Sequence, residues 1–164
     1  MDKRVYASRH GGTRKALAPS AQTKDRSQNF MDSSDNQYPN KCTLHVCKSC
    51  RPTGFPGEPR NQRPGFLLHE KLERLIEGRN LGETVTLQAA DCLSLCPRPC
   101  GIALSAPGHW TYLFGDQDSE ETANNILDCA LVYVAEPKGE MPRAKRPASL
   151  RSSIMGRIPP SFNG

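Results

Sequence analysis

Apolar residues recur with the spacing of strands and helices only between about residues 42 and 137. Leu44 and Val46 lie two residues apart in CTLHV, which predicts a short strand. A helix is predicted over about residues 66–79, where the apolar positions follow helical spacing and Gly82 lies just beyond the end. Its apolar stripe consists of Leu68, Leu72, Leu75 and Ile76.

Three more strands and a second helix are predicted beyond this helix. The segments TVTLQAA, GIALS and WTYLF have the composition of strands, and Pro107 with Gly108 favours a tight turn between the last two. Asp118 and Glu121 have the spacing of a capping box for a helix that Pro137 ends. Its buried face consists of Ala123, Ile126, Leu127, Ala130 and Val134.

These elements follow one another in the order β-α-β-β-β-α, which is the minimal layout of a thioredoxin-like α/β domain. A helix separates the first two strands, so they should lie parallel in a right-handed crossover, and the hairpin adds an antiparallel pair. We therefore predict one domain over residues 41–137, in which two helices pack against a mixed four-stranded sheet.

The two ends of the chain lack this patterning. Residues 1–40 are polar and almost without apolar periodicity, which predicts a disordered segment, and translation could begin at Met31 rather than Met1. Residues 138–164 form a basic, proline-containing tail with six Lys or Arg residues and one Glu. No aromatic residues interleave with these charges as base stacking would require, which argues against a nucleic-acid partner.

The expected compartment is the cytoplasm. The longest apolar run, residues 130–135, is far shorter than the roughly 18 residues of a membrane-spanning helix, so no membrane partner is expected. The N-terminus also lacks the apolar block of a secretory signal. In the cytoplasm, clustered thiols are more often metal ligands or redox groups than disulfides.

Five of the seven cysteines fall into two groups, each after one of the two predicted parallel strands. Cys47 and Cys50 form a C-x2-C pair. Loops at the carboxyl ends of neighbouring parallel strands converge, so the two groups should lie close together. The second group, which follows after forty-one intervening residues, consists of Cys92, Cys96 and Cys100.

Several thiolates in one place repel one another unless a cation neutralises them, so this pattern indicates a metal site. All-cysteine ligation suits an iron–sulfur cluster, whose negative charge Lys48, Arg51 and Arg98 could offset. Zinc is an alternative, because structural zinc sites also use four cysteines and the C-x2-C spacing. A thioredoxin-like thiol–disulfide oxidoreductase is another, because CKSC follows the first strand, although no helix opens at this pair.

The remaining candidates for site chemistry are weak. Cys42 and Cys129 fall on a strand and a helix and are expected in the core. No two histidines have ligand spacing, and the sequence contains no phosphate loop, paired catalytic carboxylates or nucleophile elbow. No catalytic residue is assigned, and an electron carrier or metal-binding protein is favoured over an enzyme.

Three stretches resemble an uncharacterised family of predicted metal-binding proteins, domain of unknown function 1636: VCKSCR, CLSLCPRPCGIALSAPGHWTYLFGD and RPASLRSSIMGRIPP. The family is similar to thioredoxin-like [2Fe–2S] ferredoxins, and the resemblance covers about residues 43–160. It implies Cys47, Cys92 and Cys96 as ligands, with Cys50 or Cys100 as the fourth. It further implies that the tail packs against the domain or a partner, and that cobalamin-pathway or cobalt-handling proteins are candidate partners, so zinc or cobalt handling stays an alternative.

We therefore predict a metal-binding protein and, in its most specific form, a one-electron carrier with a [2Fe–2S] cluster. The predicted cluster ligands are Cys47, Cys50, Cys92 and Cys96, and Cys100 is an additional candidate metal ligand. The cations beside the ligands favour an acidic redox protein as partner, and assembly as a homodimer is left open.

Overall fold

The structure is a computed structural model that describes residues 40–161. Apart from Asn40, the predicted disordered segment and the alternative start at Met31 lie outside the described residues.

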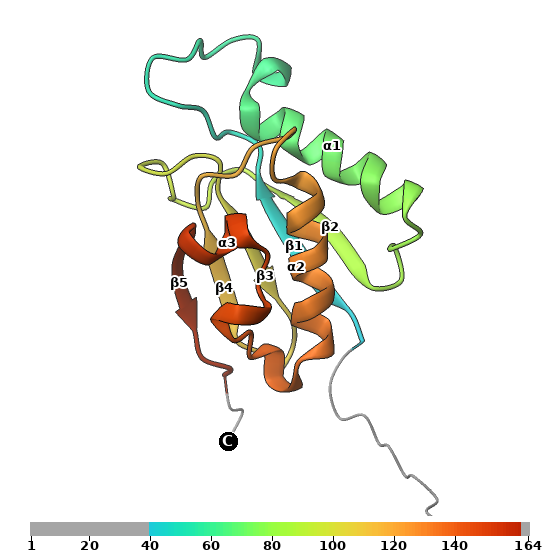
Figure 1. Cartoon of the computed structure of the whole chain (residues 1–164). Coiled ribbons are helices and arrows are strands. Elements are labelled where there is room, and N and C mark those ends of the chain that lie inside the picture. Colours follow the sequence, from blue (N-terminus) through green and yellow to red (C-terminus); the bar gives the residue numbers. More distant parts are fainter. Residues whose placement is uncertain (1–39, 162–164) are drawn as a thin grey trace, which may run out of the picture. The chain divides into compact units, whose positions relative to one another are not determined.

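One mixed sheet organises these residues, with the strand order β2-β1-β3-β4-β5 (Figure 1). β1 pairs parallel with β2 and antiparallel with β3, and β4 pairs antiparallel with both β3 and β5. The thioredoxin-like α/β fold is therefore confirmed, with five strands instead of the four predicted. The strands are β1 (Cys42–Cys47), β2 (Val85–Ala90), β3 (Ile102–Ser105), β4 (Thr111–Phe114) and β5 (Ile154–Ile158).

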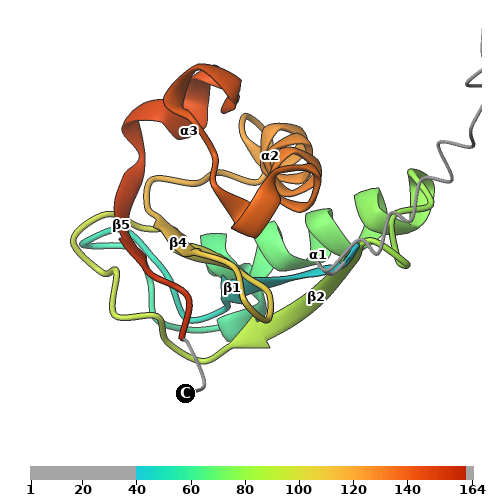
Figure 2. The same ribbon diagram turned by 90° about the horizontal axis from the view of Figure 1, so that it is seen from below.

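Two long helices, α1 (Pro64–Gly78) and α2 (Ala123–Ala135), contact each other and β1, so they cover the same face of the sheet (Figure 2). α1 begins two residues earlier than predicted because Pro64 takes the first helical position, where a missing N–H costs nothing. Within residues 40–161, no helix has the length and apolar character that crossing a membrane would require.

The start of α2 differs from the predicted capping box. Asp118 caps the turn before the helix, where its Oδ1 accepts hydrogen bonds from the N–H groups of Glu120 (2.7 Å) and Glu121 (3.0 Å). The helix itself begins at Ala123, with Thr122 at the N-cap position. The predicted cap residue is thus used, but it stabilises a preceding turn rather than the first turn of α2.

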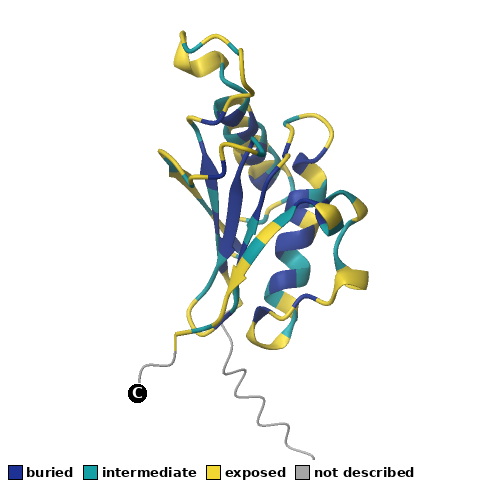
Figure 3. Cartoon of the chain, turned by 90° about the vertical axis from the view of Figure 1, so that its left-hand side faces the viewer, coloured by how far each residue is buried: buried dark blue, intermediate teal, exposed yellow. Residues whose placement is uncertain are grey.

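More buried and less buried residues alternate along β1 and β4, so the two faces of the sheet differ in burial (Figure 3 colours each residue by its burial). The face under the helices carries fully buried side chains, and they form one core with the inner sides of α1 and α2. On the other face, His45 and Ser105 are hydrogen-bonded (2.9 Å) and Thr86 and Gln88 are exposed. This is the pattern of a sheet with one packed and one solvated face. The buried strand residues are Leu44, Val46, Ile102, Leu104, Tyr112 and Phe114.

The fifth strand comes from the predicted basic tail. β5 pairs with β4 along the edge of the sheet, after the short helix α3 (Ala148–Ser152). Leu150 of this helix is fully buried, and the segment therefore packs against the domain. Three of the five residues of β5 are apolar, but they do not alternate with polar residues and Gly156 interrupts them, which is why the sequence pattern predicted no strand here.

Candidate metal centre

The loops that carry the two cysteine groups leave the sheet at the ends of β1 and β2, which pair in parallel (Figure 1). Cys47 is the last residue of β1, and its register partner is Ala90, the last residue of β2. The N–H of Lys48 donates to the carbonyl of Ala90 at 2.9 Å, which extends the pairing by one step. The Sγ atom of Cys47 then lies 3.7 Å from the carbonyl oxygen of Asp91. Parallel pairing thus brings the two cysteine-bearing loops side by side.

A cleft of about 390 Å³ lies between these loops. Its lining includes two cysteines from each loop, and Cys100 is not among the lining residues. Cys100 is instead buried, with 2% of its surface exposed. The cysteines that line the cleft are Cys47, Cys50, Cys92 and Cys96, and the other lining residues are Ser49 and residues 51–54. We call this space the cysteine cleft.

The first pair of cysteines stands on a rigid turn. The Cys50 N–H contacts the Cys47 carbonyl at 3.4 Å, and the N–H of Gly65, near the start of α1, donates to the Cys50 carbonyl at 3.1 Å. A Cβ atom on Gly65 would lie 2.2 Å from the Cys47 carbonyl oxygen. The turn therefore packs against α1 so closely that only glycine fits at position 65.

The thiol of Cys50 interacts with the thiols of Cys47 and Cys100. Its pKa is lowered to about 6, first because the thiol of Cys100 donates to it and also because the N–H of Gly101 lies 3.3 Å from its Sγ. The same hydrogen bond, together with burial, raises the pKa of Cys100. Burial raises the pKa of Cys47 to about 11. The hydrogen bonds from its neighbours therefore favour the thiolate form of Cys50 near neutral pH.

The second pair stands on an irregular loop between β2 and β3. Both Cys92 and Cys96 are exposed, and the N–H of Ser94 lies 3.2 Å from the Cys92 sulfur. Between the two cysteines, Leu95 points inward with 9% of its surface exposed and packs against Gly101. The two exposed cysteines thus lie on either side of one apolar anchor.

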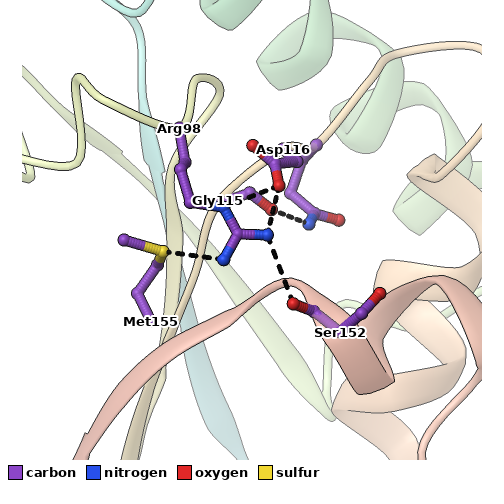
Figure 4. Close-up of polar contacts among 6 residues, drawn as sticks. Arg98, Gly115, Asp116, Ser152 and Met155 are labelled. Carbon is purple, nitrogen blue, oxygen red and sulfur yellow. Dashed lines mark hydrogen bonds and ion pairs between the residues drawn. The ribbon is translucent and has the colours of Figure 1, made fainter.

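Arg98 ties this loop to the rest of the domain (Figure 4). Its Nε donates to Asp116 Oδ2 at 2.7 Å, and its Nη2 donates to the same oxygen and to the carbonyl of Ser152 (3.2 Å). Its Nη1 lies 3.4 Å from the sulfur of Met155. One side chain therefore connects the cysteine loop with the turn after β4 and with the C-terminal segment.

The backbone around Arg98 is equally close. The N–H of Asp116 donates to the Arg98 carbonyl at 3.0 Å, and a Cβ atom on Gly115 would lie 2.6 Å from that carbonyl oxygen. From the sequence, Arg98 is expected only to place a charge beside the ligands. The tether has no local sequence signal, because Ser152 and Met155 are more than fifty positions away in the chain.

The other two predicted cations have different surroundings. Arg51 lines the cysteine cleft, and its Nη1 donates to the carbonyl of Phe55 at 2.6 Å. The ammonium group of Lys48 lies 4.7 Å from the centre of the Phe66 ring. Of the three cations considered from the sequence, Arg51 is therefore the one that contributes positive charge to the cleft lining.

The possible metal donors that line the cleft are the sulfur atoms of four cysteines. Among the His, Cys, Asp and Glu side chains of residues 40–161, no three or more are arranged to hold a single metal ion. A tetrahedral zinc site also uses four cysteines. A binuclear cluster takes two thiolates on each of its two irons, so it requires two pairs of cysteines. Two pairs from two loops line the cysteine cleft, and this donor set fits a [2Fe–2S] cluster.

The two remaining cysteines lie away from the cleft, in the core, as predicted from the sequence. Cys42 and Cys129 are buried, and the Cys129 sulfur lies 3.7 Å from the sulfur of Met141. Burial raises the pKa of each to about 12. Both are therefore packing residues.

One family model and two solved structures match most of the chain. Residues 44–160 match the model of a family described as a protein of unknown function (DUF1636). No curated protein matches the chain. Among solved structures, one described as a thioredoxin-like [2Fe–2S] ferredoxin from Aquifex aeolicus is 17% identical, with a TM-score of 0.48, covering 74% of this chain and 97% of that one. A wild-type crystal structure of such a ferredoxin from the same organism is 16% identical, with a TM-score of 0.46, covering 71% and 97%.

Proposed function

The chain belongs to the DUF1636 family of proteins of unknown function, and from that premise we propose that its cysteine cleft binds a [2Fe–2S] cluster. The observation that carries this proposal is the lining of the cleft, which brings two cysteines from each of two loops to one space. The ligands are Cys47, Cys50, Cys92 and Cys96. Cys100 is buried and donates a hydrogen bond to Cys50. The protein then acts as a one-electron carrier rather than an enzyme.

The arrangement of the thiols supports cluster binding over dithiol chemistry. A thiol–disulfide oxidoreductase attacks its substrate with an accessible thiolate of low pKa. Here the low pKa belongs to Cys50, which has only 4% of its surface exposed, while the pKa of Cys47 is raised. The exposed cysteines, Cys92 and Cys96, come from a different loop and would have no role in such an enzyme.

A bound cluster would supply a one-electron redox couple. The chain's own residues set its surroundings. The lowered pKa of Cys50 favours its thiolate form, which is the form that binds a metal. Arg51 places a positive charge at the cleft, which offsets part of the negative charge of a thiolate-bound cluster. The exposure of Cys92 and Cys96 leaves one side of the centre open to a docking redox protein.

Metal analysis and a visible absorption spectrum of protein purified without oxygen test the proposal. We expect two irons and two acid-labile sulfides per chain, with the charge-transfer bands of a [2Fe–2S] cluster. Zinc or cobalt without these bands would favour the alternative of metal handling. Metal-free protein with a readily oxidised pair would favour a thiol–disulfide oxidoreductase.

Single substitutions then assign the ligands. Cys92→Ser or Cys96→Ser should abolish normal cluster binding, and Cys100→Ser should retain a cluster because Cys100 does not line the cleft. Cys129→Ser is the matched control, since this cysteine lies in the core and should not affect the spectrum. A normal cluster in both the Cys92 and Cys96 variants would contradict the proposed ligand set.

A further inference from the structure

We propose that the protein has a second binding site, which takes a small molecule with phosphate or carboxylate groups. The site is a cleft of about 300 Å³ between β5 and the segment that precedes α3. We call it the arginine cleft. Its lining residues are Arg143, Arg146, Ile154, Met155, Gly156 and Arg157.

The charges of the arginine cleft are not balanced by the protein. Three of its lining residues are arginines and none is acidic. None of the ion pairs found within residues 40–161 includes Arg143, Arg146 or Arg157. Three like charges around one small space repel one another, and an anion bound between them would relieve that repulsion. The cleft is therefore electrostatically complementary to a ligand that carries more than one negative charge.

Backbone carbonyls hold two of the three side chains in place. Arg143 donates to the carbonyl of Arg151 at 2.7 Å, and the Nε of Arg146 donates to the carbonyl of Met141 at 3.1 Å. These bonds use one N–H each, and an arginine has five. The remaining donors of both residues can therefore bind a ligand without giving up the contacts that orient them.

Aromatic rings of the sheet add to this support. The guanidinium of Arg157 lies 4.5 Å from the centre of the Trp110 ring, and that of Arg146 lies 5.8 Å from the centre of the Tyr112 ring. Arginines that are held by carbonyls and rings lose little freedom when they bind a ligand. The cleft is thus organised before the ligand arrives.

The class of ligand follows from the donors and the size. Planar guanidinium groups bind phosphate and carboxylate with two parallel hydrogen bonds, so both oxyanions fit. A volume of about 300 Å³ is at the small end of ligand sites, and Ile154 and Met155 supply apolar contact beside the charges. Gly156 leaves open space where a side chain would stand, since a Cβ atom at that position would have no neighbouring atom within 4 Å.

The arginine cleft adjoins the cysteine-bearing loop. Met155 lines the cleft and its sulfur is also the atom that Arg98 contacts, and Arg98 stands two positions from both Cys96 and Cys100. The ligand would therefore be held next to the loop of the proposed metal centre. Binding of the anion itself requires no metal, so the inference stands or falls independently of the proposed function.

Calorimetric titration of the purified protein with inorganic pyrophosphate and, separately, with citrate tests the site. Ionic strength is held constant with KCl, because charge contacts at a surface weaken with salt. We expect saturable binding of at least one probe, and the tighter probe identifies phosphate or carboxylate as the preferred group. In the double variant Arg143→Gln/Arg157→Gln, binding should weaken by at least about tenfold, the value of one charge-assisted hydrogen bond.

A charge-matched variant separates this site from general attraction of anions. Lys41→Gln/Arg74→Gln also removes two positive charges, at exposed positions outside the arginine cleft, and should bind the probes as the unmodified protein does. No saturable binding of either probe would overturn the proposal, as would equal weakening in both double variants. Thermal unfolding of each variant without ligand shows whether the fold is retained.

Discussion

The two cysteine pairs of the proposed centre are held in opposite ways. Cys47 and Cys50 are buried on a turn that the end of β1 and the start of α1 fix from both sides. Cys92 and Cys96 are exposed on an irregular loop whose polar side-chain links to distant segments converge on Arg98. A site that must bind a cluster and still meet a partner can use both kinds of support. The buried pair sets the position, and the exposed pair gives access.

The difference also separates two sources of stability. The first pair depends on close backbone packing, which a single added methyl group would disturb. The second pair depends on a half-exposed ion pair and hydrogen bonds, which contribute less to global stability but restrain one loop. Damage to the first pair should therefore affect the whole domain, and damage to the second should remain local.

Gly65→Ala should cause the largest effect on the first pair. The new Cβ would lie 2.2 Å from the Cys47 carbonyl oxygen, a backbone atom that cannot move without displacing the turn. We expect the free energy of unfolding to fall by about 3 kcal/mol, at the upper end of typical overpacking costs. Urea denaturation followed by circular dichroism measures this change.

Gly78→Ala in the same helix is the control. Nothing lies within 4 Å of a Cβ at that position, so the substitution should stabilise α1 by about 0.5 kcal/mol through helix propensity. Equal stabilities of the two variants would show that the turn at Cys47 can shift freely, and the proposed rigidity of the first pair would be wrong.

Arg98→Met should loosen the second pair with a smaller global cost. The side chains of Arg98 and Asp116 are 36% and 48% exposed, so we expect a loss of no more than about 1 kcal/mol in the free energy of unfolding. Amide hydrogen exchange of residues 92–100 should accelerate about fivefold while α1 and β1 stay protected. Arg74→Met, at an exposed position of α1, should change neither. Unchanged hydrogen exchange in the Arg98 variant would show that Arg98 does not restrain this loop.

Most of the fold follows from local patterns in the sequence. The helical stripe with Leu68 and Leu72, the alternation of Leu44 with Val46 and the Pro107–Gly108 turn predicted elements that the structure contains. β5 could not be predicted in this way. Of its apolar residues only Ile154 is partly buried, while Met155 and Ile158 are exposed, so the strand is held by its pairing with β4, and such a long-range contact leaves no local periodicity.

The candidate site was predictable to the level of which loops meet, because parallel pairing of β1 and β2 places their ends together. Which of the cysteines line the cleft could not be predicted. Whether Cys50 or Cys100 lines the cleft depends on how the loop returns into β3, where Cys100 and Gln117 exchange backbone hydrogen bonds at 3.1 and 3.2 Å. Those bonds draw Cys100 inward, and its role as donor to Cys50 follows from that burial.

The smallest predicted effect tests whether Cys100 donates a hydrogen bond to Cys50. In metal-free protein, ultraviolet absorption should show one thiolate forming as the pH rises through about 6, and Cys50→Ala should remove it. Cys100→Ala deletes the thiol that donates to Cys50, so the midpoint should rise toward the ordinary value of about 8.5. Cys92→Ala should leave the midpoint unchanged, because its sulfur takes no part in the hydrogen bonds around Cys50. An unchanged midpoint in the Cys100 variant would contradict the assigned donor.

The same pKa shifts determine whether the stability of the fold rises or falls with pH. The pKa of Cys50 is lower in the folded chain, so between about pH 6 and pH 8.5 the unfolded chain binds more protons and stability rises with pH. Above about pH 8.5 the raised pKa values of Cys47 and Cys100 reverse the slope, because the folded chain now retains protons that the unfolded chain loses. Urea midpoints of metal-free protein should therefore pass through a maximum near the ordinary thiol pKa. A monotonic rise across this range would show that Cys47 and Cys100 ionise as readily in the folded chain as in the unfolded chain, which would contradict their raised pKa values.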